Sequence, residues 1–136
     1  MMKQRIGLTA TVMIWNLSMI AVAQSLPLQS RTYRMGSGYI QLATESGRTC
    51  YHGFSARGAI VASVSADPKH EGFYLVNGLN DFVLHQQDTE TLLAGSLTQL
   101  VTYEADYSTS ENISDVLREC LNSNEAFYNQ VSGGRG

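Results

Sequence analysis

The sequence of 136 residues has little charge and almost no lysine. Lysine and arginine together number nine against twelve acidic residues, and Lys69 is the only lysine besides Lys3. A chain without a basic stripe is a poor candidate for binding nucleic acid or an anionic membrane, because cationic contacts supply most of the affinity for both. Only two prolines and no runs of charge occur, which argues against a disordered chain. We therefore expect one folded domain, with no nucleic acid among its partners.

The first 23 residues are predicted to be a cleaved signal peptide. Lys3 and Arg5 form a short basic start, positions 6–22 are largely apolar, and an Ala-Val-Ala cleavage pattern ends at Ala23. An uncleaved anchor helix is the alternative, since about 17 residues can just span a bilayer. Cleavage removes two basic residues and no acid, so the net charge changes from −3 to −5. The pattern predicts export to a periplasm or the extracellular space, without stable membrane insertion after cleavage.

Cysteine is nearly absent as well. Cys50 and Cys120 are the only two cysteines, and both follow the expected cleavage site. In an oxidising compartment two such thiols most simply form one disulfide. A catalytic thiol pair fits less well, because redox pairs usually have C-x-x-C spacing. The bond closes a loop of about 70 residues, for which a chain-entropy model gives a stabilisation on the order of 4 kcal/mol.

Composition divides the exported part into three segments. Residues 24–37 contain Pro27 and end in the first two residues of the Gly-Ser-Gly sequence at 36–38, so they are expected to be an extended N-terminal leader. Residues 38–131 are expected to form a single α+β domain. Residues 132–136, with the sequence Ser-Gly-Gly-Arg-Gly, are expected to be a flexible tail.

An apolar period of two begins at position 39 and is typical of β-strands. Strands are expected at 39–44, 48–54, 59–66, 73–76, 82–85 and 91–94. The short glycine-containing links at 45–47 and 55–58 favour hairpins between the first three. The strands at 73–76 and 82–85 are apolar on both faces, so we expect them to be central, with a further layer covering their second side.

The apolar period becomes helical near the C-terminal end. Five apolar residues share one helical stripe, namely Ile113, Val116, Leu117, Cys120 and Leu121. Ser110 is the expected N-cap of this helix. A shorter helix is expected after Ser96, because Gln99 lies at capping-box spacing, although 100–103 is also compatible with a strand. The predicted fold is therefore α+β, an antiparallel sheet of about five to six strands covered by a C-terminal amphipathic helix, with an open barrel as the alternative.

The histidines give no metal signature. His52, His70 and His85 lack the close spacing of a short metal-binding segment, so we expect neither a metal nor a cofactor. A small secreted hydrolase, nuclease-like or other, could still use His52 or His85 with an acid such as Glu71 or Asp81. The sequence contains no nucleophile elbow and no phosphate-binding loop. The hydrolase is therefore an alternative hypothesis, without an assigned catalytic residue.

Tyrosine is the residue type that most favours binding, with seven copies in the chain. Tyr51 and Tyr74 alternate with residues assigned to the helix-covered face, so they are expected on the other face. With Arg57 and His85 near its edge, this face is a possible binding surface. The competing interpretation is a second small core beneath the leader or the last helix. We predict a small exported non-catalytic accessory or binding protein for a protein or small-molecule ligand, with a toxin or inhibitor as a further alternative.

Overall fold

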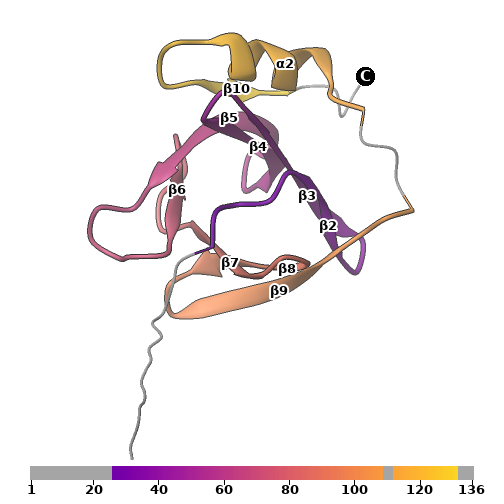
Figure 1. The fold of residues 1–136 in the computed structure, drawn as a ribbon, viewed down its shortest axis with the longest axis vertical. Helices are drawn as coiled ribbons and strands as arrows, with labels where there is room; N and C mark the ends of the chain where they lie inside the picture. Colours follow the sequence, from indigo (N-terminus) through magenta and orange to yellow (C-terminus); the bar gives the residue numbers. More distant parts are fainter. Residues whose placement is uncertain (1–25, 109–111, 132–136) are drawn as a thin grey trace, which may run out of the picture.

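The computed structural model describes residues 26–108 and 112–131 (Figure 1). The elements are β2 (Arg31–Met35), β3 (Gly38–Glu45), β4 (Arg48–Ser55), β5 (Gly58–Ala66), β6 (Tyr74–Val76), β7 (Val83–Asp88), β8 (Thr91–Ser96), β9 (Gln99–Ala105), α2 (Asp115–Asn122) and β10 (Tyr128–Gln130). The expected signal peptide, the expected tail and Ser110 lie outside the described residues, so those predictions stay predictions.

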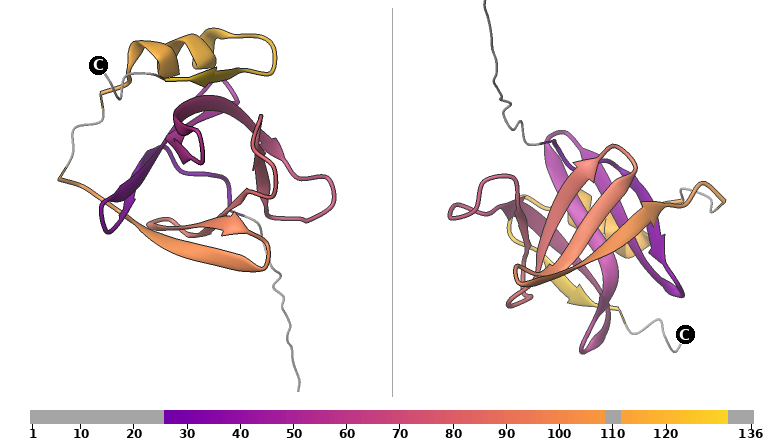
Figure 2. Two further views of the ribbon diagram at one scale, coloured as in Figure 1. Left: turned by 180° about the vertical axis from the view of Figure 1, so that it is seen from behind. Right: turned by 90° about the horizontal axis from the view of Figure 1, so that it is seen from below.

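Strands β2 to β9 form a closed up-and-down barrel, in which each strand pairs antiparallel with the next. The barrel closes where Tyr33 of β2 pairs with Ala105 of β9. The extra strand β10 pairs with Ile60–Ala62 of β5, beside the stretch Val64–Ala66 that pairs with β6. The helix α2 lies outside the barrel with β10 (Figure 2). The predicted α+β sheet covered by a helix is therefore wrong, because the sheet curls into a closed eight-stranded barrel.

Two segments form strands where the sequence predicts other structure, and the physical reason is similar in both. Arg31–Met35, expected in the leader, form β2, and Gln99–Ala105, where a short helix was expected, form β9. Ser96 and Gln99 face each other across the β8–β9 hairpin and do not form a capping box. β2 and β9 pair with each other, and each also pairs with its neighbour in sequence. Pairing between residues far apart in sequence therefore outweighs weak local signals.

The interior of the barrel is filled with apolar side chains. Its fully buried members include Tyr33, Ile40, Leu42, Tyr51, Ile60, Val76, Leu84 and Leu92. Eight strands enclose a space that side chains just fill, in agreement with this packing. Gly53 contributes to the fit, because a Cβ atom there would overlap the Tyr51 hydroxyl group.

A second apolar cluster lies outside the barrel, beneath α2. Its buried members come from β3, β4, β5 and the helix, and they are Ala43, Cys50, Val61, Leu117, Cys120 and Leu121. The predicted disulfide between Cys50 and Cys120 is confirmed, with 6.3 Å between the Cα atoms. The helix is shorter than its stripe predicted, since Ser114 caps it by accepting a hydrogen bond from the Leu117 amide at 3.1 Å. The helix therefore covers one part of the barrel wall.

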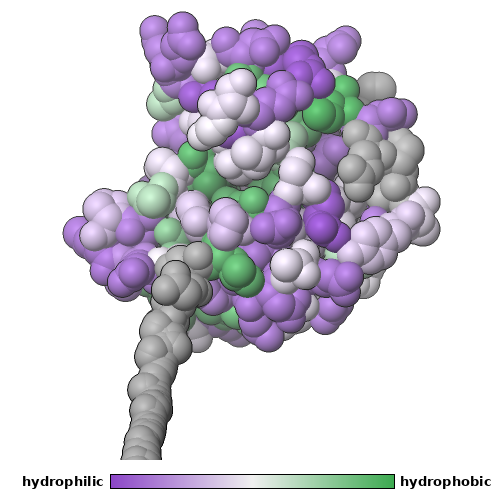
Figure 3. Space-filling model, viewed as in Figure 1, coloured by the Kyte–Doolittle hydropathy of each residue, from purple (hydrophilic) through white to green (hydrophobic). Residues whose placement is uncertain are grey.

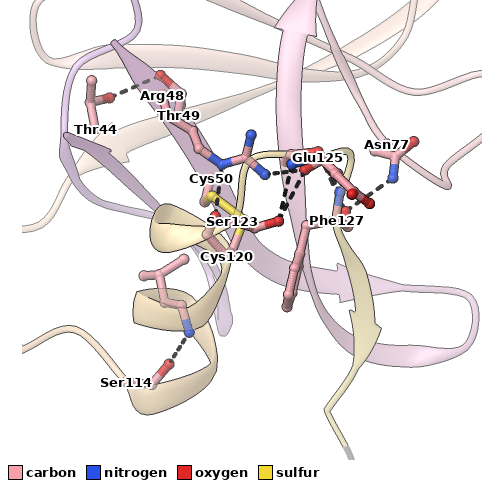
Figure 4. The surroundings of a disulfide bond; sticks show 12 residues. Thr44, Arg48, Thr49, Cys50, Asn77, Ser114, Cys120, Ser123, Glu125 and Phe127 are labelled. Carbon is pink, nitrogen blue, oxygen red and sulfur yellow. Dashed lines mark hydrogen bonds between the residues drawn. A yellow bond between two sulfur atoms is a disulfide. The ribbon is translucent and has the colours of Figure 1, made fainter. Parts of the chain in front are cut away.

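Arg48 of β4 stabilises the C-terminal end of this helix (Figure 4). Its Nε donates to the carbonyl oxygen of Cys120 at 2.7 Å, and one terminal nitrogen donates to the carbonyl oxygen of Glu125 at 2.5 Å. The last turn of α2 has no basic residue of its own. Because the carboxyl end of a helix attracts positive charge, Arg48 provides the missing cation from a neighbouring strand.

The barrel has two different ends. The closed end carries the β3–β4, β5–β6 and β7–β8 turns, and residues 26–30 cross it, as the indigo segment before β2 shows in Figure 1. Leu28 of this segment is buried in the barrel core. The open end carries the β2–β3, β4–β5, β6–β7 and β8–β9 turns. In the described chain no segment crosses the open end, which faces the viewer in the left panel of Figure 2.

Candidate binding cleft at the open end

The structure does not bring the four predicted binding residues together on one surface. Tyr51 and Tyr74 both point into the barrel, and burial raises the pKa of Tyr51. The Tyr74 hydroxyl lies near the closed end, 3.4 Å from the carbonyl oxygen of Leu26. His85 is on the outer wall, and Arg57 is in the β4–β5 turn at the open end. Closing the barrel turns one whole face of the sheet inward, which is why the tyrosine face became part of the core.

The histidines lie apart from one another. His52 is on the outer wall of β4, where its ring contacts Tyr39, and burial lowers its pKa. The ring of His85, on β7, stacks on Phe73 at 4.7 Å, and its Nδ1 is 2.8 Å from the carbonyl oxygen of Gly72. Within residues 26–108 and 112–131 neither ring has a carboxylate partner.

The third histidine belongs to an exposed loop. His70 Nδ1 is 2.9 Å from a carboxylate oxygen of Asp67, and the same carboxylate accepts the Lys69 amide. These contacts shape the β5–β6 turn. Among the residues that the structure describes, no three His, Cys, Asp or Glu side chains are grouped so that they could hold a metal ion.

A cleft of about 280 Å³ lies at the open end, between the β4–β5 turn and the β6–β7 loop. Phe54, Leu79 and Phe82 supply apolar surface, while Arg57 and Asp81 supply one positive and one negative charge. Its volume is close to the lower limit of small-molecule sites, about 300 Å³. Barrel mouths are a usual place for such sites, because turns there can vary without disturbing the strands.

The aromatic walls of the cleft are held by neighbouring rings. Phe82 packs edge-on against Tyr51 of the barrel core, with 5.7 Å between ring centroids. Phe54 packs edge-on against Tyr39 at 5.6 Å, yet 54% of Phe54 remains exposed. The Phe82 ring is therefore held by the core, while the Phe54 ring lies on the outer face of β4 with His52 and packs toward Tyr39.

Arg57 is positioned by the C-terminal strand. One of its terminal nitrogens donates to the Tyr128 hydroxyl at 3.1 Å, and its guanidinium lies 5.7 Å from the centroid of that ring. Gln130 donates to the carbonyl oxygen of Arg57 at 2.6 Å, and the Arg57 amide donates to Ser55. Neither Arg57 nor Asp81 forms an ion pair within the described part of the chain. The site can therefore offer a guanidinium group beside exposed aromatic surface.

The remainder of the open end is also apolar. Five large hydrophobic side chains are exposed among the described residues, and four of them lie at or near this end, namely Met35, Phe54, Leu97 and Val101. We call these four the apolar rim. The closed end differs, since polar residues dominate the face in Figure 3, with apolar residues showing in a few smaller patches, one of them near the centre.

A larger groove of about 450 Å³ lies between β5, β6 and residues 124–126. Its cation is Arg48, whose guanidinium already donates to the carbonyl oxygens of Cys120 and Glu125. Arg48 in this groove is therefore already bonded to the C-terminal end of α2, whereas Arg57 in the cleft at the open end lies beside aromatic residues.

Of the cleft residues, the sequence had indicated only Arg57 as a binding residue. From the sequence, Asp81 is a candidate catalytic acid, whereas Phe54 and Phe82 belong to predicted strands. A signal was present in the six-residue link at 77–82, which is long for a hairpin and places two large apolar residues in a turn.

No family model, no curated protein and no solved structure matches the chain. The only helix in the described ranges, α2, is too short to cross a membrane.

Proposed function

We propose that this chain is a small exported non-catalytic binding protein, and that it binds its ligand in the cleft at the open end. The observation that carries the proposal is the convergence of Phe54, Leu79 and Phe82 with the Arg57 guanidinium on one cleft. Export is supported by the N-terminal sequence pattern, and a disulfide is compatible with an oxidising compartment.

The chemistry of the cleft favours a flat apolar group that carries a negative charge. The exposed ring of Phe54 and the half-buried ring of Phe82 offer contacts to an aromatic or planar group. Arg57 can donate to a carboxylate or a similar anion, because its guanidinium has five N–H donors and only one is engaged with Tyr128 in the described structure. The filled barrel interior is consistent with binding at the end of the barrel.

Phenylacetate is a suitable probe, with the neutral phenylacetamide and the cationic phenethylamine as comparisons of similar shape. We expect backbone amide resonances of residues 54–57 and 78–82 to shift in NMR titrations of the exported protein. A ligand of about ten heavy atoms should bind only in the millimolar range. The affinity should fall in the order phenylacetate, phenylacetamide, phenethylamine.

Two variants separate the charge from the rings. Arg57→Gln should lower the affinity for phenylacetate to that for phenylacetamide, while Arg118→Gln on the far helix surface should leave it unchanged. Phe54→Ala should weaken all three probes and change the free energy of unfolding by less than about 0.5 kcal/mol, because the ring is largely exposed. Shifts outside the cleft, or equal affinities for the three probes, contradict the proposal.

A further inference from the structure

We propose that two copies of this chain associate head to head through their open ends. The first observation is the apolar rim, of which Met35, Leu97 and Val101 come from the open end of β2, the β8–β9 turn and β9, while Phe54 lies beside them on the outer wall. Single exposed apolar residues are common on protein surfaces, but their collection at one end is typical of an interaction surface. A second copy is the partner that the charges of the molecule favour.

The two ends differ in charge. The open-end turns, at 36–37, 56–57, 77–82 and 97–98, contain one cation, Arg57, and one acid, Asp81. The closed-end turns, at 46–47, 67–73 and 89–90, contain three acids, Asp67, Glu71 and Glu90, and one lysine, Lys69. Because the chain has a net charge of −3, two copies repel each other in general. This repulsion is smallest when the two copies meet at their open ends, whose turns carry no net charge.

The positive and the negative charge of the open end can each pair with the opposite charge of a second copy. Arg57 lies on the β4–β5 side of the cleft and Asp81 on the β6–β7 side. In a two-fold interface each surface meets its own copy, so a residue that contacts a second residue is contacted by it in return. A two-fold axis that passes midway between these two residues would place Arg57 of each copy opposite Asp81 of the other.

The contact is small. A standard stable interface buries about 800 Å² on each partner, and four partly exposed side chains with a cleft of about 280 Å³ supply less than this. We therefore expect a concentration-dependent dimer with a dissociation constant in the micromolar range or weaker. This association does not depend on the proposed ligand, although the dimer covers the cleft.

Sedimentation velocity of the exported protein between about 1 and 500 μM tests the proposal, with dissociation constants fitted from the shift between monomer and dimer. Arg57→Asp and Asp81→Arg should each weaken the dimer roughly tenfold or more, because each places like charges opposite each other. The double variant Arg57→Asp/Asp81→Arg exchanges the charges and should restore the dissociation constant to within about threefold. Glu71→Arg at the closed end is the matched control for a charge reversal and should not weaken the dimer.

A monomer at every concentration overturns the proposal, as does a dimer whose charge-exchanged double variant is not restored. A monomer that sediments with neutral phosphatidylcholine vesicles would show that the rim faces lipid, and would also overturn it. The phenylacetate titration is independent of these outcomes, since it is performed at concentrations where the monomer dominates. Failure of the dimer and failure of the ligand site are therefore distinguishable.

Discussion

Each end of the barrel has both short turns and one longer link, but the two ends are completed in different ways. At the closed end, residues 26–30 cross the mouth, and Gln86 makes four hydrogen bonds inside the barrel, with Gln29, Tyr33, Asp88 and Thr91. At the open end the mouth is occupied by side chains of the β6–β7 loop, and ring surface stays exposed. A satisfied buried polar network stabilises a fold, whereas exposed apolar surface is available for binding. We therefore expect the closed end to contribute more to stability, while the proposed ligand cleft lies at the open end.

The largest expected effect is at the closed end. Gln86→Leu keeps a similar volume but leaves the Gln29 amide and the carbonyl oxygens of Asp88 and Thr91 without their partner. Each buried polar group left unpaired costs about 1 to 3 kcal/mol, so the free energy of unfolding should fall by about 3 to 4 kcal/mol. Urea denaturation followed by circular dichroism measures it. The control Gln87→Leu, at the exposed neighbouring position, should change it by less than about 0.5 kcal/mol.

A smaller loss is expected at the open end. Gly78 has φ of +87°, and a Cβ atom there would overlap the ring of Tyr128. Gly78→Ala should lower the free energy of unfolding by about 2 kcal/mol, through backbone strain and displacement of this ring.

Gly36→Ala is the matched control for Gly78→Ala, because Gly36 also has a positive φ of +60° but open space around the added atom. Denaturation of the two variants should show the larger loss for Gly78→Ala. Equal losses would mean that the Tyr128 contact contributes nothing and that the open end is less tightly packed than we infer.

The smallest expected effect is a pH dependence beside the closed end. Hydrogen bonds from Ser108 and from Arg34 lower the pKa of Asp106 to about 2. A carboxyl group with a lowered pKa stabilises the fold above its ordinary pKa of about 4, and this contribution is lost as the pH falls toward 2. Asp106→Asn should therefore be less stable than the wild type at pH 6, and the difference should shrink between about pH 4 and pH 2.

Arg34→Gln provides the second arm of the pH experiment. Removing this guanidinium should reduce the pH dependence without abolishing it, because the hydrogen bonds from Ser108 remain. Denaturation series at four or five pH values measure both variants. A difference between wild type and Asp106→Asn that stays constant down to pH 2 would contradict the assignment.

Local patterns were sufficient for much of the secondary structure. Six strands were predicted from the sequence. Arg48–Ser55 and Gly58–Ala66 follow visible alternation, whereas the strands around 73–76 and 82–85 are apolar on both faces, and the stripe around Leu117 and Cys120 correctly indicated a helix. The disulfide was predictable because the chain has only two cysteines. β2 and β9 were not predictable in the same way, since Arg31–Met35 has little apolar alternation and Gln99–Ala105 follows a misleading capping-box pattern.

The candidate site was less accessible from the sequence than the strands were. Arg57 was indicated, but its neighbours in the cleft come from a loop more than twenty residues away. Tyr51 was expected on a surface because an open sheet leaves one face for solvent or a partner. In a closed barrel the same alternation places that ring in the core, and Phe54 three residues later becomes the exposed aromatic group.

The sequence by itself determined which residues alternate, where the turns occur, and which two cysteines can pair, because each of these depends on neighbours in the chain or on the mere count of a residue type. Only the tertiary structure decided that the sheet closes, which face turns inward, and that Phe54, Arg57, Asp81 and Phe82 share one cleft. Closure depends on the pairing of β2 with β9, about 70 residues apart, and no local pattern encodes the partner of an edge strand.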